Sequence, residues 1–190
     1  MLSDDELLRG CSKGDRNIQK MLYERFAHKM YLVCLRYTKN QMEAEDILQE
    51  SFIKIFENLP KFRKECPLEA WIKRIVINTA LKQNRSKLYL YPAVDIEDVQ
   101  ENFIEEITLS QFHFTELLQM IQQLAPRYQV VFNLYAIEGY QHNEIAEMLG
   151  ISEGTSKSQY SRARAQLQNM VGEKTSIVAT SGIYEGGKRD

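Results

Sequence analysis

Apolar residues recur at steps of three and four along most of this 190-residue chain, the spacing of one buried face of an α-helix. Three such stripes predict helices over about 17–38, 42–58 and 67–85. Pro60 cannot continue the second helix, and Pro67 suits the first turn of the third because its missing N–H is no loss there. No convincing run of alternating strands is found, so the first half of the chain is predicted to be all-helical.

The helical spacing fades between residues 91 and about 110, where acidic residues accumulate. A segment with so little apolar surface to bury predicts a linker. The spacing then returns in a helix that opens at Pro126 and closes at Gly139, a residue suited to a C-terminal cap, before a short and a longer helix. The chain is therefore predicted to be all-α, with two small helical domains over 1–90 and 113–172, an acidic linker over 91–112 and a tail over 173–190 that is expected to be disordered.

The stretch from Glu138 to Met170 carries the most specific local pattern, that of a helix-turn-helix. Gly150 can take the positive φ that a tight turn between helices needs, and Ser152 suits the N-cap of the second helix. The exposed face of that helix is predicted to carry Lys157, Ser158, Ser161, Arg162 and Ala165, with Arg164 at its flank. Short polar groups and guanidinium groups there suit readout of a DNA major groove. The alternative is a helical hairpin with a solvated basic face.

The formal net charge of -2 conceals two adjacent blocks of opposite sign. Residues 61–90 carry 8 basic and 2 acidic groups, whereas residues 91–125 carry 7 acidic groups and no Lys or Arg. Aromatic residues lie among the cations of the basic block, where they can stack on unpaired bases while the cations neutralise phosphates. The alternative is that Trp71 belongs mostly to the core and that the cations solvate a surface helix. The near-neutral total therefore excludes no nucleic-acid-binding function.

Glu43, Asp46 and Glu50 share one edge of the helix predicted over 42–58 because their spacing is i, i+3 and i+7. Such an edge suits either a basic partner or a plain solvated face. A metal-dependent helical enzyme is a weaker hypothesis, because none of the three histidines has the ExxH spacing of a bundle metal site. The sequence has no GxxxxGK[ST], GxSxG or CxxC motif, so no catalytic residue, metal or cofactor is expected.

Cysteine usage and hydropathy bear on the compartment. The three cysteines, Cys11, Cys34 and Cys66, have no CxxC spacing, and their odd number argues against a disulfide framework. No apolar run approaches the roughly 18 residues that a membrane span needs, and the N-terminus is acidic, unlike a signal peptide. A cytoplasmic protein without direct membrane insertion is expected.

Taken in order, these motifs resemble those of bacterial sigma factors of the sigma-70 superfamily, specifically the extracytoplasmic-function (ECF) group. The resemblance covers about residues 15–90 and 115–172. The first part follows the family order with LYERFAHKMYLVCLRYTKN, EAEDILQESFIKIFENLPKF and AWIKRIVINTALKQNRSK, and the second with LAPRYQVVFNLYAIEGYQHNEIAEMLGISEGTSKSQYSRARAQL. It implies a transcription initiation factor that binds core RNA polymerase, directs it to promoters by recognising the −35 and −10 elements, and aids strand opening.

The resemblance also implies which residues do this. Docking on the clamp helices of the largest bacterial polymerase subunit falls to Asp46, Gln49, Glu50 and Phe52. Recognition and melting of the −10 element falls to Lys64, in the loop expected to hold a flipped base, and to Trp71, Lys73, Arg74, Asn78, Lys82 and Arg85. Recognition of the −35 element falls to Thr155, Lys157, Ser158, Gln159, Ser161, Arg162 and Arg164. The acidic linker is expected to thread toward the polymerase active centre.

Two residues depart from the family pattern. The family usually has an apolar β-branched residue where this chain has Ser156, which is expected to cost the recognition helix a core contact. It usually has Arg where this chain has Gln159, which removes one phosphate contact. Both departures bear on the strength of −35 binding and not on its location.

Family members are often sequestered by an anti-sigma factor, which makes such a protein a candidate partner. An autonomous helix-turn-helix regulator with a ligand-sensing N-terminal domain is the alternative. It explains the C-terminal motif but not the order of the acidic helix and the basic block.

Overall fold

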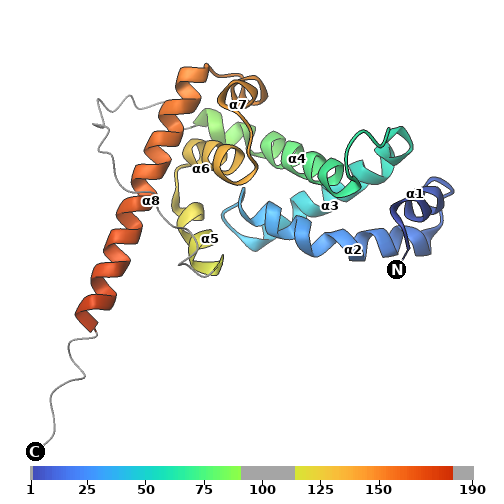
Figure 1. Ribbon diagram of the computed structural model, residues 1–190, viewed down its shortest axis with the longest axis horizontal. Coiled ribbons are helices and arrows are strands. Elements are labelled where there is room, and N and C mark those ends of the chain that lie inside the picture. Colours follow the sequence, from blue (N-terminus) through green and yellow to red (C-terminus); the bar gives the residue numbers. More distant parts are fainter. Residues whose placement is uncertain (1, 91–113, 182–190) are drawn as a thin grey trace, which may run out of the picture. The chain divides into compact units, whose positions relative to one another are not determined.

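The computed structural model describes residues 2–90 and 114–181, and the chain divides into two compact units, Met1–Tyr91 and Pro92–Asp190. Within the described residues every regular element is a helix (Figure 1), which confirms the all-α prediction. The linker expected over 91–112 lies outside the described residues. None of the helices in the described parts is long and apolar enough to cross a membrane.

The first unit, over its described residues 2–90, contains four α-helices and one 3-10 turn. They are α1 (Asp4–Ser12), α2 (Arg16–Leu35), α3 (Gln41–Asn58), η1 (Leu59–Lys61) and α4 (Leu68–Leu90). The helices predicted over 17–38, 42–58 and 67–85 are therefore α2, α3 and α4. The side chain of Asn40 caps α3 by accepting from the backbone N–H of Glu43, and the 3-10 turn that contains Pro60 follows the end of α3.

Helices α2, α3 and α4 pack on one another and bury the apolar stripes that predict them. Leu22 and Met30 of α2, Ile55 of α3 and Ile72 of α4 are almost wholly excluded from solvent. Full burial of each such side chain contributes about 1.5–3 kcal/mol. The buried amide of Asn84 donates to the backbone carbonyl of Tyr37 at 2.7 Å, which ties α4 to the end of α2. This core holds α3 and α4 in one fixed arrangement.

The second unit contains α5 (Phe114–Gln123), α6 (Pro126–Phe132), the π-helical segment η3 (Asn133–Ile137), α7 (His142–Leu149) and α8 (Glu153–Ser181). Pro126 is the first residue of α6, and Gly139 has a φ of +81° just after η3, as the sequence predicts. The core of this unit joins α5, α6 and α8 through Met120, Ile121, Leu124, Phe132, Ala163 and Leu167. Within this unit α8 is the longest helix, and α5, α6 and α7 pack along it (Figure 1).

The tail expected over 173–190 is corrected in part, because α8 continues to Ser181. The sequence between Glu173 and Ser181 contains no Pro or Gly, and an established helix extends without a new nucleation step. Residues 182–190 lie outside the described residues.

Candidate nucleic-acid interface

Helix α3 presents a face to solvent that is acidic and partly apolar. Asp46 and Gln49 are exposed, and Glu50 is half-buried beside them. Met42 and Ile53 stand on the same face, at helical spacing, with exposed fractions of 74% and 59%. We call Met42, Asp46, Gln49, Glu50 and Ile53 the α3 face. Exposed large apolar side chains rimmed by charge are typical of surfaces that bind another protein.

Sequence reasoning missed Met42 and Ile53. The signal was present, because both residues fall outside the apolar stripe that α3 buries and lie among its acidic residues. Two exposed apolar side chains on a charged face indicate a protein-binding surface as much as the charges do.

Glu50 is held in place by groups from two helices. Its carboxylate accepts from Lys54 Nζ at 2.5 Å and from Gln83 Nε2 of α4 at 2.6 Å. Lys54 Nζ also donates to Thr79 Oγ1 of α4 at 3.2 Å. The Lys54 hydrogen bond, with that of Gln83, holds the pKa of Glu50 below its usual range. The negative charge of Glu50 is therefore kept at a fixed place between the acidic helix and the basic one.

Phe52 does not lie on the α3 face, and its predicted role in docking is wrong. Its exposed fraction is 3%, and its ring meets Tyr23 edge-on at a centroid distance of 4.6 Å. Phe52 follows Leu48 by four residues and precedes Ile55 by three, so it belongs to the stripe that α3 turns inward. It supports the α3 face from inside the core.

The loop before α4 is fastened to α1. Lys64 has a φ of +61°, an uncommon left-handed conformation for a side-chain-bearing residue, and its Nζ pairs with Asp5 Oδ1. This hydrogen bond lowers the pKa of Asp5. A cavity of about 570 Å³ lies there, lined from α1 by Asp5, Leu8, Arg9, Ser12 and Lys13 and from the loop side by Leu59, Pro60, Phe62 and Lys64. Lys64, predicted from the sequence to lie near a flipped base, thus lines a cavity together with two other cations, Arg9 and Lys13.

Helix α4 carries a basic, exposed edge. Arg74, Asn78, Lys82 and Arg85 are exposed and recur at steps of four, four and three, which puts them on one side of the helix. The other two predicted residues of this group lie deeper: Lys73 is half-buried, and Trp71 is half-buried against Phe62, with ring centroids 5.0 Å apart. The structure therefore brings four of the predicted α4 residues together and places Trp71 partly in the core.

Helices α7 and α8 form the predicted helix-turn-helix. Gly150 ends α7 in the left-handed conformation, with φ +67° and ψ +38°, and the Ile151 N–H donates to the Ala146 carbonyl at 3.1 Å. Ser152 Oγ accepts from the Thr155 N–H at 3.0 Å and so caps α8. Both sequence predictions for this turn are confirmed.

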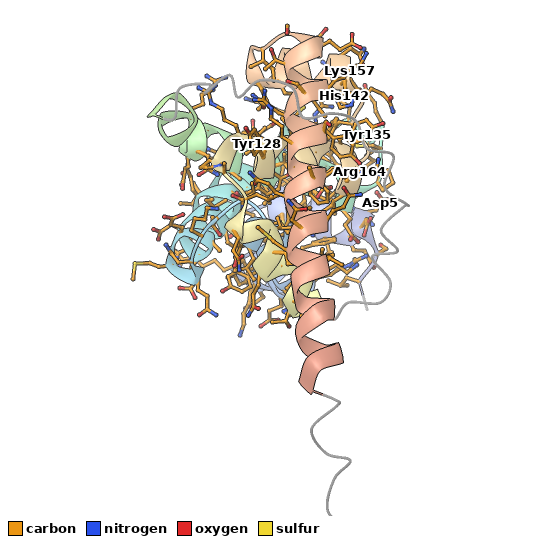
Figure 2. The ribbon with its side chains drawn as sticks, turned by 90° about the vertical axis from the view of Figure 1, so that its left-hand side faces the viewer. Asp5, Tyr128, Tyr135, His142, Lys157 and Arg164 are labelled. Atoms are coloured by element: carbon orange, nitrogen blue, oxygen red, sulfur yellow. The ribbon has the colours of Figure 1, made fainter. Side chains whose placement is uncertain are left out.

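The first turns of α8 present the polar residues that the sequence singles out. Lys157, Ser158 and Ser161 are exposed, whereas Thr155, Arg162 and Arg164 are half-buried. Lys157 Nζ forms an ion pair with Glu153 at 2.7 Å, and Ser158 Oγ donates to the Thr155 carbonyl at 3.0 Å. Lys157 and Arg164 both stand on α8 in Figure 2.

Gln159 is a correction to this set, because its exposed fraction is 7% and its side chain faces the interior of the unit. It lies four residues before Ala163 and eight before Leu167, both buried, and so shares their side of α8. A residue in that position cannot reach a base or a phosphate. The predicted Gln159 contact with −35 DNA is therefore wrong.

Ser156 also lies in the interior, and its exposed fraction is 0%. The expected loss of an apolar core contact stays a prediction, and the structure adds a polar contact at this position, because Ser156 Oγ lies 2.9 Å from His142 Nδ1 at the start of α7. The apolar contact of the family pattern is replaced by a hydrogen bond.

Among residues 2–90 and 114–181, no group of three or more His, Cys, Asp or Glu side chains is placed to hold a metal ion. Cys11 and Cys34 are buried, and burial raises the pKa of the Cys34 thiol to about 12.

Two family models match this chain, one within each unit. The model described as Sigma-70 region 2 matches residues 22–87, and the model described as Sigma-70, region 4 matches residues 114–167. The two matches together cover more than half of the chain, and they follow the order of the acidic helix, the basic edge and the helix-turn-helix. The chain belongs to the sigma-70 family.

Curated relatives align with almost the whole chain. It is 28% identical over 182 residues to the ECF RNA polymerase sigma-E factor of Salmonella typhimurium, covering 90% of this chain and 95% of that protein. It is 27% identical over 170 residues to the ECF RNA polymerase sigma factor SigM of Mycobacterium tuberculosis, covering 90% of this chain and 85% of that protein. With both sigma regions in place, the protein is a transcription initiation factor that directs polymerase to promoters.

Solved structures share the fold. The sigma factor RpoE from Bartonella quintana, crystallised with the anti-sigma factor NepR, superposes with a TM-score of 0.52 at 20% identity, covering 80% of this chain and 96% of that one. CnrH, solved in complex with the cytosolic domain of CnrY, superposes with a TM-score of 0.50 at 20% identity, covering 90% and 97%.

Proposed function

We propose that this protein binds core RNA polymerase through the α3 face. Asp46 and Glu50 supply fixed negative charge for a basic partner, and Met42 and Ile53 supply apolar surface that becomes buried on docking. Charge complementarity speeds encounter and sets orientation, whereas the apolar contacts contribute affinity. The hydrogen bonds from Lys54 and Gln83 hold Glu50 in place before the partner arrives, so less side-chain freedom is lost on binding.

We propose further that the α4 edge and the Lys64 loop capture the −10 element. Arg74, Lys82 and Arg85 can neutralise phosphates of one strand, and Asn78 can donate to and accept from a base edge. Taking a base out of the stack costs a few kcal/mol. Docking on polymerase and capture of the unpaired strand must offset that cost together.

The proposed −35 contacts lie on α8. Lys157, Ser158 and Ser161 face solvent in its first turns, where a recognition helix meets base edges, and Thr155, Arg162 and Arg164 stand beside them for phosphates. Gln159 takes no part, because it is buried. The residues over 91–112 connect the two DNA-binding units and, being acidic, suit a channel built for nucleic acid.

The proposed mechanism consists of binding and strand separation, without a covalent step and without a cofactor. We expect the protein to act in the cytoplasm, where promoter DNA and core polymerase occur. An anti-sigma factor is a candidate regulator, since RpoE and CnrH, which share the fold, were each solved with a protein partner.

One observation carries this proposal: each sigma region falls on its own helical unit, and the exposed groups on that unit suit its part of the task. Run-off transcription tests it, with a library of bacterial promoters, core polymerase, and the chain present or absent. We expect discrete start sites only when both proteins are present. If the chain instead binds duplex DNA tightly and specifically without polymerase, it is an autonomous helix-turn-helix regulator.

A further inference from the structure

Ser156 is the one serine of the recognition helix's first turns that points inward. It is wholly excluded from solvent, while Ser158 and Ser161 are exposed. A buried hydroxyl is costly unless it has a hydrogen-bond partner, and the partner here is His142 Nδ1 at 2.9 Å. His142 is the first residue of α7. The bond therefore joins the start of one helix of the motif to the start of the other.

Two aromatic rings pack against the imidazole of His142, and one of them, Tyr135, is labelled beside it in Figure 2. It stacks on Tyr135 of η3 with centroids 4.2 Å apart and planes 10° apart, and Tyr160 approaches it at 5.9 Å. Tyr160 also packs on Tyr135 at 4.6 Å. Because Ser156 and Tyr160 lie one turn apart on α8, the stacked pair of His142 and Tyr135 contacts two successive turns of the recognition helix.

Burial, followed by the nearby charge of Lys157, lowers the pKa of His142, and Glu153 opposes this in part. The ring is therefore neutral at neutral pH, and its Nδ1 can share one hydrogen bond with the serine hydroxyl.

We propose that His142 is a positioning residue for −35 recognition, which sets the rotation of α8 through Ser156. This inference rests on the proposed −35 role of α8. A hydrogen bond is directional, whereas the apolar contact expected at position 156 can slide. Rotating a helix by about 20° about its axis displaces a side-chain tip by roughly 2 Å, given a helix radius of about 6 Å with side chains. Such a displacement takes Lys157 and Ser158 out of hydrogen-bond reach of a base.

The test uses the holoenzyme reconstituted from core polymerase and the full chain, on a promoter chosen by the wild-type holoenzyme from a random library. The measured quantity is the ratio of run-off transcript from that promoter to transcript from the same promoter with its −35 element replaced. His142→Leu leaves the buried serine hydroxyl without a hydrogen-bond partner, and Ser156→Val does the same to the imidazole. Each change is therefore expected to lower the ratio about tenfold. The double variant, His142→Leu with Ser156→Val, leaves neither group buried without a partner. Its transcript ratio should therefore fall no further than that of either single variant.

Two further variants separate positioning from general instability. His142→Asn keeps a polar atom near the place of Nδ1, and we expect it to retain most of the ratio. Glu147→Ala changes an exposed residue of the same helix and should leave the ratio as it is. All assays are run well below the unfolding temperature of each variant, measured by circular dichroism.

A selection on a library randomised only in the −35 element gives the second readout. A rotated helix changes the preferred bases at particular positions, whereas partial unfolding weakens all positions alike. A shifted preference in His142→Leu, restored in His142→Asn, supports the inference. One result would overturn this inference alone: the wild-type holoenzyme distinguishes the intact from the replaced −35 element, but the losses of the two single variants add in the double variant. A wild type indifferent to the −35 sequence would overturn the proposed role of α8, and this inference with it.

Discussion

Ile53 offers the sharpest quantitative test of the α3 face, because it is a large, exposed apolar side chain among the acidic residues proposed to dock on polymerase. Its exposed fraction is 59%, and full burial of such a side chain contributes about 1.5–3 kcal/mol. If docking buries what is now exposed, Ile53→Ala removes about 1–2 kcal/mol of binding free energy. That loss corresponds to a dissociation constant about 5- to 30-fold higher.

The assay is a titration of fluorescently labelled chain with core polymerase, followed by anisotropy. The matched control is Met21→Ala, which shortens an exposed apolar side chain on α2, outside the α3 face. The free energy of unfolding should change by less than about 0.5 kcal/mol in both variants, since both positions are exposed. An unchanged dissociation constant for Ile53→Ala, or an equal loss for Met21→Ala, would refute the assignment of this face.

Three other predictions follow from the same geometry. Asp46→Lys places a cation where the docking partner is proposed to be basic, so run-off transcription should fall to the level of core alone while the circular dichroism spectrum stays that of wild type. Phe52→Ala empties a buried site beside Tyr23, and urea titration should show a loss of about 3–5 kcal/mol in the stability of the first unit; a loss under 1 kcal/mol would mean that the ring is not in the core. Because the pKa of His142 in the folded chain lies below the ordinary histidine value of about 6.5, the unfolded chain binds more protons at low pH. The contribution of His142 to stability is therefore complete above about pH 6.5 and falls as the pH drops below it. Thermal unfolding of the second unit between pH 5 and 8 should show this fall in the wild type and not in His142→Asn.

The sequence predicts the long helices well because their apolar stripes, proline breaks and caps agree. It does not predict α1, which has nine residues and buries only Leu7, Leu8 and Cys11. A signal was nonetheless present: Ser3 and Glu6 have the spacing of a capping box, and the structure shows both of its hydrogen bonds. Without α1, the pairing of Lys64 with Asp5 and the cavity beside it could not be foreseen.

The errors at the site share one physical cause. Phe52 and Gln159 stand next to exposed residues, and a motif read along the chain does not separate neighbours that lie about 100° apart around a helix. Their spacing to Leu48 and Ala163 places both of them inside. The bond between His142 and Ser156 is of another kind, because it joins residues 14 positions apart across a turn and depends on how two helices meet.

The central claim is that this chain opens promoters only together with polymerase. The most direct measurement places 2-aminopurine in the non-template strand of the −10 element of a selected promoter, and follows its fluorescence with the chain alone, core polymerase alone, and both. The account predicts a rise in fluorescence only with both proteins, and weak promoter binding by the chain alone, whose net charge is -2. A rise with the chain alone, or none when both are present, would contradict it.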